Sequence, residues 1–129
     1  MKRILCIALC FLPIAAHAQM SAEDFERYTS GRTLIFGQNG QAYGAERYLP
    51  GRRVTWSFLD GECRDGIWYP HDGNICFLYE DRDAPQCWQF TETPTGLIAR
   101  FAGENTVLEL YEARETQDEM ICLGPEVGV

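Results

Sequence analysis

The sequence has few of the side chains that most catalytic and metal-binding sites require. It contains only two histidines, His17 and His71, and three serines, Ser21, Ser30 and Ser57. A nucleophilic triad needs a serine or cysteine held beside a base, and no serine here lies in a pattern that predicts one. Zinc sites usually draw on several cysteine and histidine ligands. We therefore expect no catalytic residues, no metal site and no cofactor.

Two local patterns leave an alternative to this expectation. His71 stands next to Asp72 and could form a base and its orienting group, but both lie in a predicted turn, where a histidine is normally solvated. The acidic run 80–83 could offer oxygens to calcium, but it lacks the glycine and the distal glutamate of an EF-hand loop. Both patterns favour a solvated surface over a site.

Basic residues are also scarce. The chain has 11 Lys and Arg against 19 Asp and Glu, a net charge of −8. Binding to nucleic acid or to anionic lipid depends on basic side chains that meet the negative phosphates. The charge balance therefore argues against nucleic acid and membrane surfaces as partners. It suits a surface that keeps a protein soluble, or one that meets a basic protein.

No apolar run is long enough to cross a membrane. The longest, from Ile4 to Ala16, is too short for a membrane-spanning helix. It follows the basic start Met1-Lys2-Arg3 and ends in Ala16-His17-Ala18, the pattern of a secretory signal peptide. We expect residues 1–18 to be removed and residues 19–129 to form a single periplasmic or secreted domain, without membrane insertion after cleavage.

Six cysteines are present, of which Cys6 and Cys10 belong to the predicted signal peptide. The mature chain keeps an even number, and an oxidising compartment favours their pairing into two disulfides. Four cysteines allow three pairings. These four are Cys63, Cys76, Cys87 and Cys122.

The mature chain begins with one short helix and continues as strands. Ser21 starts a capping pattern, which predicts a helix over residues 22–29 that ends before Gly31. Beyond it, runs rich in Val, Ile, Thr and aromatic residues alternate with Gly, Pro, Asn and Asp, which is typical of strands and turns. Eight strands are expected, near residues 32–37, 41–48, 52–59, 63–69, 74–80, 86–92, 96–102 and 106–113.

Alternation and turn length predict which strand residues face one another. In the segment 52–58 the apolar residues Val54, Trp56 and Phe58 alternate with polar ones, so we expect all three to be buried on one face. The two-residue Asp72-Gly73 turn sets the register of the first hairpin, and the next turn, between the expected strands 74–80 and 86–92, sets that of the second. The pairs expected opposite each other are Trp68 and Phe77, Pro70 and Ile75, Ile75 and Trp88, and Cys76 and Cys87, with their large side chains in one core.

The same register predicts the disulfide pairing. Cysteines opposite each other across an antiparallel pair lie within bonding range, so Cys76 is expected to bond to Cys87. Cys63 is then left to bond to Cys122. This second bridge ties the C-terminal tail to the rest of the domain.

Short strands in consecutive order favour closure into a barrel, because closure removes the exposed sheet edges. The predicted fold is mainly β: a small up-and-down antiparallel β-barrel of about eight strands, with one short N-terminal helix and two disulfides. A barrel of this size can be filled by its own side chains or can hold one small ligand. The sequence leaves both possibilities open.

Aromatic residues make up 12% of the chain. At strand spacing most aromatic side chains belong to the core, and some can line a cavity or an exposed stacking surface. Two consecutive arginines after the Pro50-Gly51 turn could meet an anion at the barrel mouth. The candidate ligand or partner contacts are Tyr43, Arg52, Arg53, Trp56, Trp68 and Trp88.

Several motifs together resemble a family of small uncharacterised periplasmic proteins of alphaproteobacteria. They are Gly31-Arg32-Thr33, the segment from Tyr43 to Val54, Gly66-Ile67-Trp68-Tyr69, Ile75-Cys76-Phe77 and Cys87-Trp88. The resemblance implies a lipocalin-like or similar small barrel, and it brings no catalytic residues. A weaker similarity is to periplasmic C-type lysozyme inhibitors, which use a Ser-Gly-x-x-Tyr motif. Here Ser30-Gly31 is followed by Leu34 at the tyrosine position.

We therefore expect a non-enzymatic binding module of the cell envelope. Its partner is either a small apolar ligand in the barrel or a basic protein on its acidic face. The alternatives are an inhibitor of a basic hydrolase and an envelope structural protein.

Overall fold

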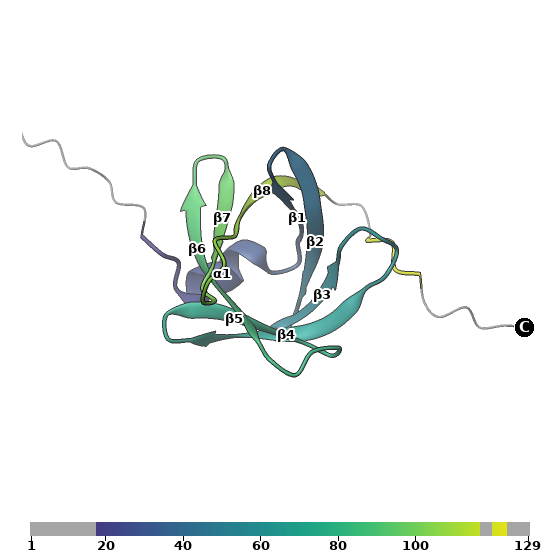
Figure 1. Ribbon diagram of the computed structural model, residues 1–129, viewed down its shortest axis with the longest axis horizontal. Coiled ribbons are helices and arrows are strands. Elements are labelled where there is room, and N and C mark those ends of the chain that lie inside the picture. Colours follow the sequence, from purple (N-terminus) through teal and green to yellow (C-terminus); the bar gives the residue numbers. More distant parts are fainter. Residues whose placement is uncertain (1–17, 117–119, 124–129) are drawn as a thin grey trace, which may run out of the picture.

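The computed structural model describes residues 18–116 and 120–123. Helix α1 (Ala22–Thr29) precedes eight strands: β1 (Thr33–Gln38), β2 (Gln41–Leu49), β3 (Arg53–Ser57), β4 (Arg64–His71), β5 (Asn74–Tyr79), β6 (Gln86–Thr93), β7 (Gly96–Phe101) and β8 (Glu109–Thr116). Each strand pairs antiparallel with the next, and β8 pairs with β1 to close the barrel (Figure 1). The predicted fold is confirmed. Residues 1–17 of the predicted signal peptide lie outside the described residues, so its cleavage stays a prediction.

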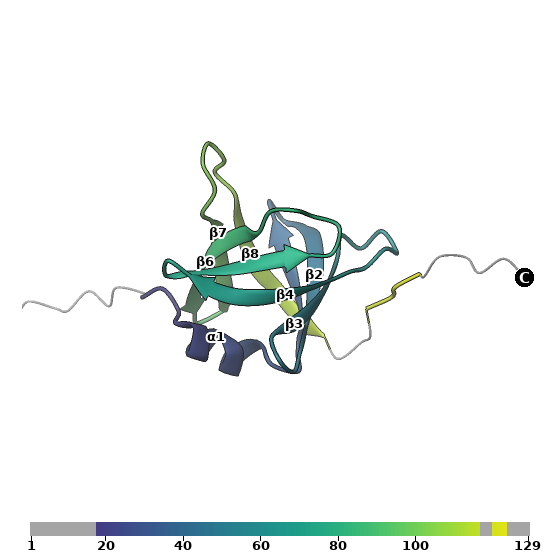
Figure 2. The ribbon, with the colours of Figure 1, turned by 90° about the horizontal axis from the view of Figure 1, so that it is seen from below.

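Helix α1 lies across one end of the barrel (Figure 2). Ser21 caps it, because its hydroxyl accepts the Asp24 N–H at 3.1 Å. Phe25 is completely buried and meets the rings of Tyr48 and Trp68 edge-on, at centroid distances of 5.6 and 5.1 Å. We call this end, covered by α1, the closed end and the opposite end the open end.

The predicted registers are confirmed. Trp68 lies opposite Phe77, Pro70 opposite Ile75, Ile75 opposite Trp88, and Cys76 opposite Cys87. The turn between β4 and β5 has Asp72 and Gly73 at φ 48° and 76°, as a tight hairpin turn with two left-handed residues requires. Local turn chemistry therefore places these residues across from one another.

Both disulfides form as predicted, between Cys76 and Cys87 and between Cys63 and Cys122, with Cα–Cα distances of 4.0 and 5.3 Å. Disulfides persist in oxidising compartments, and the two bridges are consistent with a protein that lies outside the cytoplasm. Within residues 18–116 and 120–123, none of the helical structure has the length and apolar character needed to cross a bilayer.

The burial predicted for β3 is wrong in part. Val54 is buried, but Trp56 is only half-buried and Phe58 is 40% exposed. Phe58 lies just beyond the end of β3, at the open end, where no helix covers it. The prediction assumed that every inward side chain reaches a filled core, and the barrel is filled only toward α1.

Two polar residues of β3 are buried, although the alternation predicts them to be exposed. Thr55 is 7% and Ser57 1% exposed. The Thr55 hydroxyl donates to Asp65 at 2.8 Å, and the Ser57 hydroxyl accepts the Leu59 N–H at 3.0 Å. These internal hydrogen bonds satisfy the polar atoms that burial removes from water.

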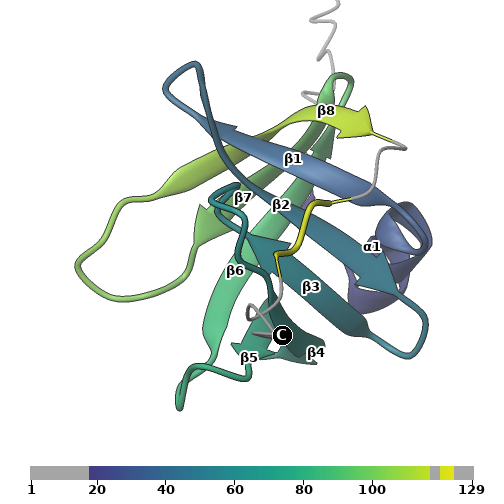
Figure 3. The same cartoon turned by 90° about the vertical axis from the view of Figure 1, so that its right-hand side faces the viewer.

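The C-terminal segment 120–123 runs beside β2 and β3 on the outside of the barrel (Figure 3). Arg47 donates to the Met120 carbonyl at 3.4 Å, and the Leu123 N–H donates to the Gly61 carbonyl at 2.6 Å. The Cys63–Cys122 bridge fixes the segment in this place.

The burial predicted for Pro70 is wrong. Pro70, which was expected in the core with Ile75, is exposed, because it lies near the end of β4 beside the hairpin turn.

Candidate binding cavity

A cavity of about 100 Å³ occupies the half of the barrel away from α1. No residue of α1 lines it. The side chains around it range from buried to exposed, so the cavity reaches the surface at the open end. Its lining residues are Phe36, Tyr43, Glu46, Tyr48, Trp56, Phe58, Arg64, Phe77, Tyr79, Arg82, Gln86, Trp88, Phe90, Ala99 and Leu110.

An aromatic cluster forms the wall of the cavity beside β2 and β3. Trp56 contacts Tyr43 and Phe58, with centroid distances of 6.0 and 5.3 Å. Gly44 leaves the space that the Trp56 ring occupies, because a Cβ at this position would collide with the indole. The rings of Tyr43 and Phe58 are inclined at 49° and 87° to the Trp56 ring, and an aromatic wall of this kind suits a flat or apolar guest.

Glu46 is the buried acidic group of the cavity. It is 2% exposed, and its Oε1 accepts the Tyr79 hydroxyl at 2.9 Å. Its Oε2 is buried and has no hydrogen-bond partner among the described residues. Burial raises the pKa of Glu46 well above the usual value, and the Tyr79 hydrogen bond only partly opposes this. An uncharged carboxyl group is the form that burial without a cation favours.

The two tyrosines beside Glu46 resist ionisation as well. Burial, followed by the proximity of Glu46, raises the pKa of Tyr48 and of Tyr79 well above 10. Their hydroxyl groups therefore stay protonated at any physiological pH, and Tyr79 remains a hydrogen-bond donor to Glu46.

Arg64 lies on the same inward row as Glu46. The register pairs Glu46 with Trp56 and Trp56 with Arg64, so the three residues are neighbours across β2, β3 and β4. The Arg64 Nε lies 2.6 Å from Asp81, and its Nη2 lies 3.9 Å from Glu62. Its Nη1 is buried and has no hydrogen-bond partner in the described part of the chain.

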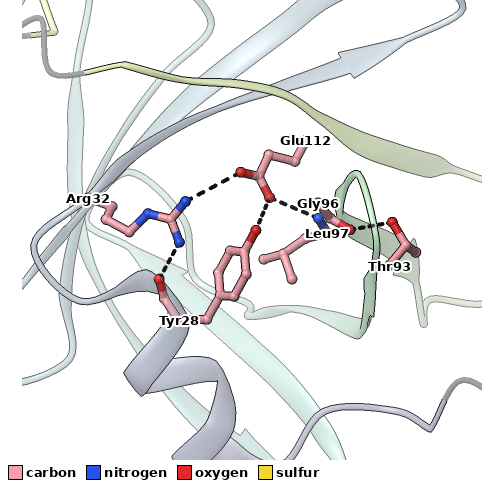
Figure 4. Close-up of polar contacts among 6 residues, drawn as sticks. All are labelled: Tyr28, Arg32, Thr93, Gly96, Leu97 and Glu112. Carbon is pink, nitrogen blue, oxygen red and sulfur yellow. Dashed lines mark hydrogen bonds and ion pairs between the residues drawn. The ribbon is translucent and has the colours of Figure 1, made fainter.

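The closed end carries a different polar cluster, between α1 and β8 (Figure 4). Glu112 accepts the Tyr28 hydroxyl at 2.7 Å and the Leu97 N–H at 2.8 Å, and lies 3.6 Å from Arg32. Arg32 in turn donates to the Tyr28 carbonyl at 2.7 Å. Burial, then the hydrogen bond to Glu112, raises the pKa of Tyr28 to about 12. The cluster fastens the helix to the barrel.

The candidate contacts from the sequence divide between the two ends. Tyr43, Trp56 and Trp88 line the cavity. Trp68 is instead buried against Phe25, with the guanidinium of Arg52 4.6 Å from its ring centroid. Arg52 also pairs with Glu26 of α1 at 3.2 Å, and Arg53 donates to the Pro50 carbonyl at 3.1 Å. The three residues Trp68, Arg52 and Arg53 are not part of the cavity lining.

The polar residues of the cavity were not singled out from the sequence. Glu46, Arg64, Tyr79 and Arg82 all line it. A signal for Glu46 was present, because the residue two positions on, Tyr48, is a large ring, and residues two apart on a strand share a face. For Arg64 and Arg82 we find no comparable pattern.

The His71–Asp72 pair lies where β4 ends and the exposed turn to β5 begins, with Nε2 and Oδ2 3.1 Å apart and the two side chains 66% and 84% exposed. In residues 18–116 and 120–123, no three His, Cys, Asp or Glu side chains gather in a way that could hold a metal ion.

Comparison with known proteins adds no relative: the chain matches no family model, no curated protein and no solved structure.

Proposed function

We propose that this chain is a non-enzymatic binding protein of the periplasm or the extracellular space, and that it holds a small molecule in the open end of its barrel. The observation that carries the proposal is the cavity of about 100 Å³, lined by aromatic rings and closed at its far side by the helix-covered core. Binding sites are typically concave and apolar, with a few polar groups that orient the ligand. The proposal includes the expected kinship with small lipocalin-like periplasmic barrels.

The size of the cavity limits the guest. Pockets for drug-sized ligands measure roughly 300–1,000 Å³, whereas a cavity of about 150 Å³ is enough for one benzene ring. The present cavity is smaller than both. It therefore takes a short chain or part of one ring, and the rest of the ligand extends past the exposed Phe58.

Ala99 offers a way to close the cavity without disturbing its polar groups. It is 2% exposed, lines the cavity, and is paired with Phe90 and Leu110, which line it too. In Ala99→Leu the added carbons occupy the space of the ligand. Ala102→Leu is the matched control, because Ala102 is exposed and lies outside the lining.

The experiment combines native mass spectrometry with a titration of ligand-free protein by benzene, followed through tryptophan fluorescence. We expect a small molecule to co-purify with the wild type and with Ala102→Leu, and benzene to change the fluorescence of both. Ala99→Leu loses both effects. Absence of both a co-purifying small molecule and any benzene response in the wild type overturns the proposal, and co-purification of a stoichiometric basic protein instead supports the inhibitor alternative.

A further inference from the structure

We propose that the ligand of this cavity is a small organic acid or amide, whose carbonyl-type oxygen lies between the side chains of Glu46 and Arg64. The inference rests on the proposed function, since it concerns the ligand of the same cavity. It specifies which chemical group is recognised and which two residues recognise it.

The first donor is the carboxyl group of Glu46. Its Oε1 already accepts a hydrogen bond from Tyr79, so the proton of the uncharged acid belongs on Oε2, the oxygen without a partner among the described residues. The titratable groups that act on it are Tyr79 of β5 and Tyr48 of the same strand, and the charged residues Arg64 and Arg82 line the same cavity. In the uncharged form Glu46 offers a hydrogen bond to the cavity and requires an acceptor.

The second donor is the guanidinium group of Arg64. Asp81 and Glu62 hold its Nε and Nη2 sides, and its carbon lies 5.3 Å from the centroid of the Phe58 ring. These contacts fix the orientation of the group, which has only 23% of its side chain exposed. Nη1 is the remaining buried donor, and an arginine cannot accept a hydrogen bond.

Both donors flank Trp56 on one inward row of the barrel wall. Neighbouring strands are about 4.8 Å apart, which places the backbones of Glu46 and Arg64 roughly 10 Å from each other. Two inward side chains from these positions can reach a shared acceptor above the Trp56 ring. A carboxylate or amide oxygen accepts two hydrogen bonds, and the apolar body of the ligand then packs against Phe36 and Leu110, which line the cavity too.

An amine is a poorer guest at this place. It brings no acceptor for Arg64, and it meets the positive charges of Arg64 and Arg82 in a cavity where the carboxyl group of Glu46 is uncharged. Binding of an amine requires Glu46 to ionise. Variants of Glu46 and Arg64 therefore distinguish a ligand with an acceptor oxygen from an amine.

The test measures the binding of four compounds that share one ring: benzoate, benzamide, benzylamine and benzene. Isothermal titration at pH 7 is carried out on the wild type, Glu46→Leu, Glu46→Gln and Arg64→Met. Arg100→Met is the control, because Arg100 pairs with Glu109 on the exposed surface and lies outside the lining. All variants retain the two disulfides, and their folding is checked by circular dichroism.

We expect benzoate and benzamide to bind the wild type more tightly than benzene and benzylamine do. Glu46→Leu and Arg64→Met each weaken benzoate by about 10-fold or more, the effect of losing one charge-assisted hydrogen bond. Glu46→Gln weakens it less, because the amide donates from the same position. Arg100→Met binds all four compounds as the wild type does.

Two results overturn the inference. Preferential binding of benzylamine, lost in Glu46→Gln, identifies the site as one for cations. Equal affinity for benzene and benzoate, unaffected by Arg64→Met, shows that the cavity recognises only apolar surface, which leaves the proposed function standing. Failure of all four compounds to bind contradicts the proposed function itself.

Discussion

The two ends of the barrel contain similar residues but differ in packing and in hydrogen bonding. At the closed end Phe25 fills the centre, and the carboxylate of Glu112 accepts hydrogen bonds from Tyr28 and from the Leu97 backbone. At the open end the carboxyl group of Glu46 has one hydrogen bond, and one of its oxygens has no partner among the described residues. Both ends thus place an acidic group beside a tyrosine, but only at the closed end do both the Tyr28 hydroxyl and a backbone N–H donate to it.

This difference separates a structural cluster from a candidate binding site. Buried polar groups in native proteins are nearly always hydrogen-bonded, and an exception calls for an explanation. The cost of leaving Glu46 and Arg64 incompletely bonded falls on stability, while the benefit appears only when a ligand supplies the missing bonds. Substitutions of the polar groups at the two ends should therefore change the free energy of unfolding in opposite directions and by different amounts.

The largest expected effect is at the closed end. Phe25→Ala removes a fully buried ring from the centre of the core, and we expect the free energy of unfolding to fall by about 3–5 kcal/mol. Phe58→Ala removes the same side chain from the open end, where it is 40% exposed, and should cost less than about 1 kcal/mol. Urea unfolding of both variants measures the difference. Equal losses would show that the two ends do not differ in packing.

The next largest loss of stability is expected in the polar cluster between α1 and β8. Glu112→Ala leaves the Tyr28 hydroxyl and the Leu97 N–H without their acceptor, so we expect a loss of about 2–3 kcal/mol. Glu109→Ala, which breaks the exposed pair with Arg100, should cost no more than about 0.5 kcal/mol. Hydrogen exchange should show weaker protection of α1 in Glu112→Ala alone. If the two variants are equally stable, the cluster does not fasten the helix.

At the open end we expect a substitution to raise the free energy of unfolding instead of lowering it. Because burial raises the pKa of Glu46, the folded protein holds a proton that the unfolded chain loses above about pH 4.5. Stability from this group is therefore complete below that pH and declines as the pH rises toward the folded pKa. Glu46→Gln has no such titration and should be more stable than the wild type at pH 8.

Unfolding of the wild type and Glu46→Gln by urea at pH 4, 6 and 8 tests this. The difference in unfolding free energy, and not the stability of either protein alone, isolates Glu46 from the other titrating groups. It should grow with pH. A difference that is constant over this range, or that favours the wild type at pH 8, means that Glu46 is already ionised in the folded protein.

What the sequence predicts well are the features set by neighbouring residues. The Asp72-Gly73 turn determines the register of β4 and β5, and the next connection, over residues 80–85, places Cys76 opposite Cys87 across β5 and β6. The strand order and the closed barrel follow from short strands with tight turns between them. Apart from the closing pair of β1 and β8, these features depend on contacts between strands that are neighbours in the chain.

The features that the sequence does not predict depend on where α1 docks. Alternation correctly turns Trp56 and Phe58 inward, but it cannot tell a filled interior from an open one. The position of Phe25 makes that distinction, and it is a contact between segments far apart in the chain. Glu46 was overlooked because a charged residue within a strand is normally assigned to the solvent face.

The smallest expected effect tests whether charge pairs add to the stability of the closed end. Arg52 and Glu26 lie 3.2 Å apart, with side chains 34% and 43% exposed, and pairs this accessible contribute roughly 0–1 kcal/mol. Glu26→Gln should cost no more than about 0.5 kcal/mol, whereas Arg52→Met also removes the contact with the Trp68 ring and should cost about 1 kcal/mol. Thermal unfolding at low and high salt separates the contribution of the ion pair from that of the ring contact, because salt screens the ion pair more. A loss above about 2 kcal/mol in Glu26→Gln would mean that charge, rather than the packing of Phe25, holds the helix on the barrel.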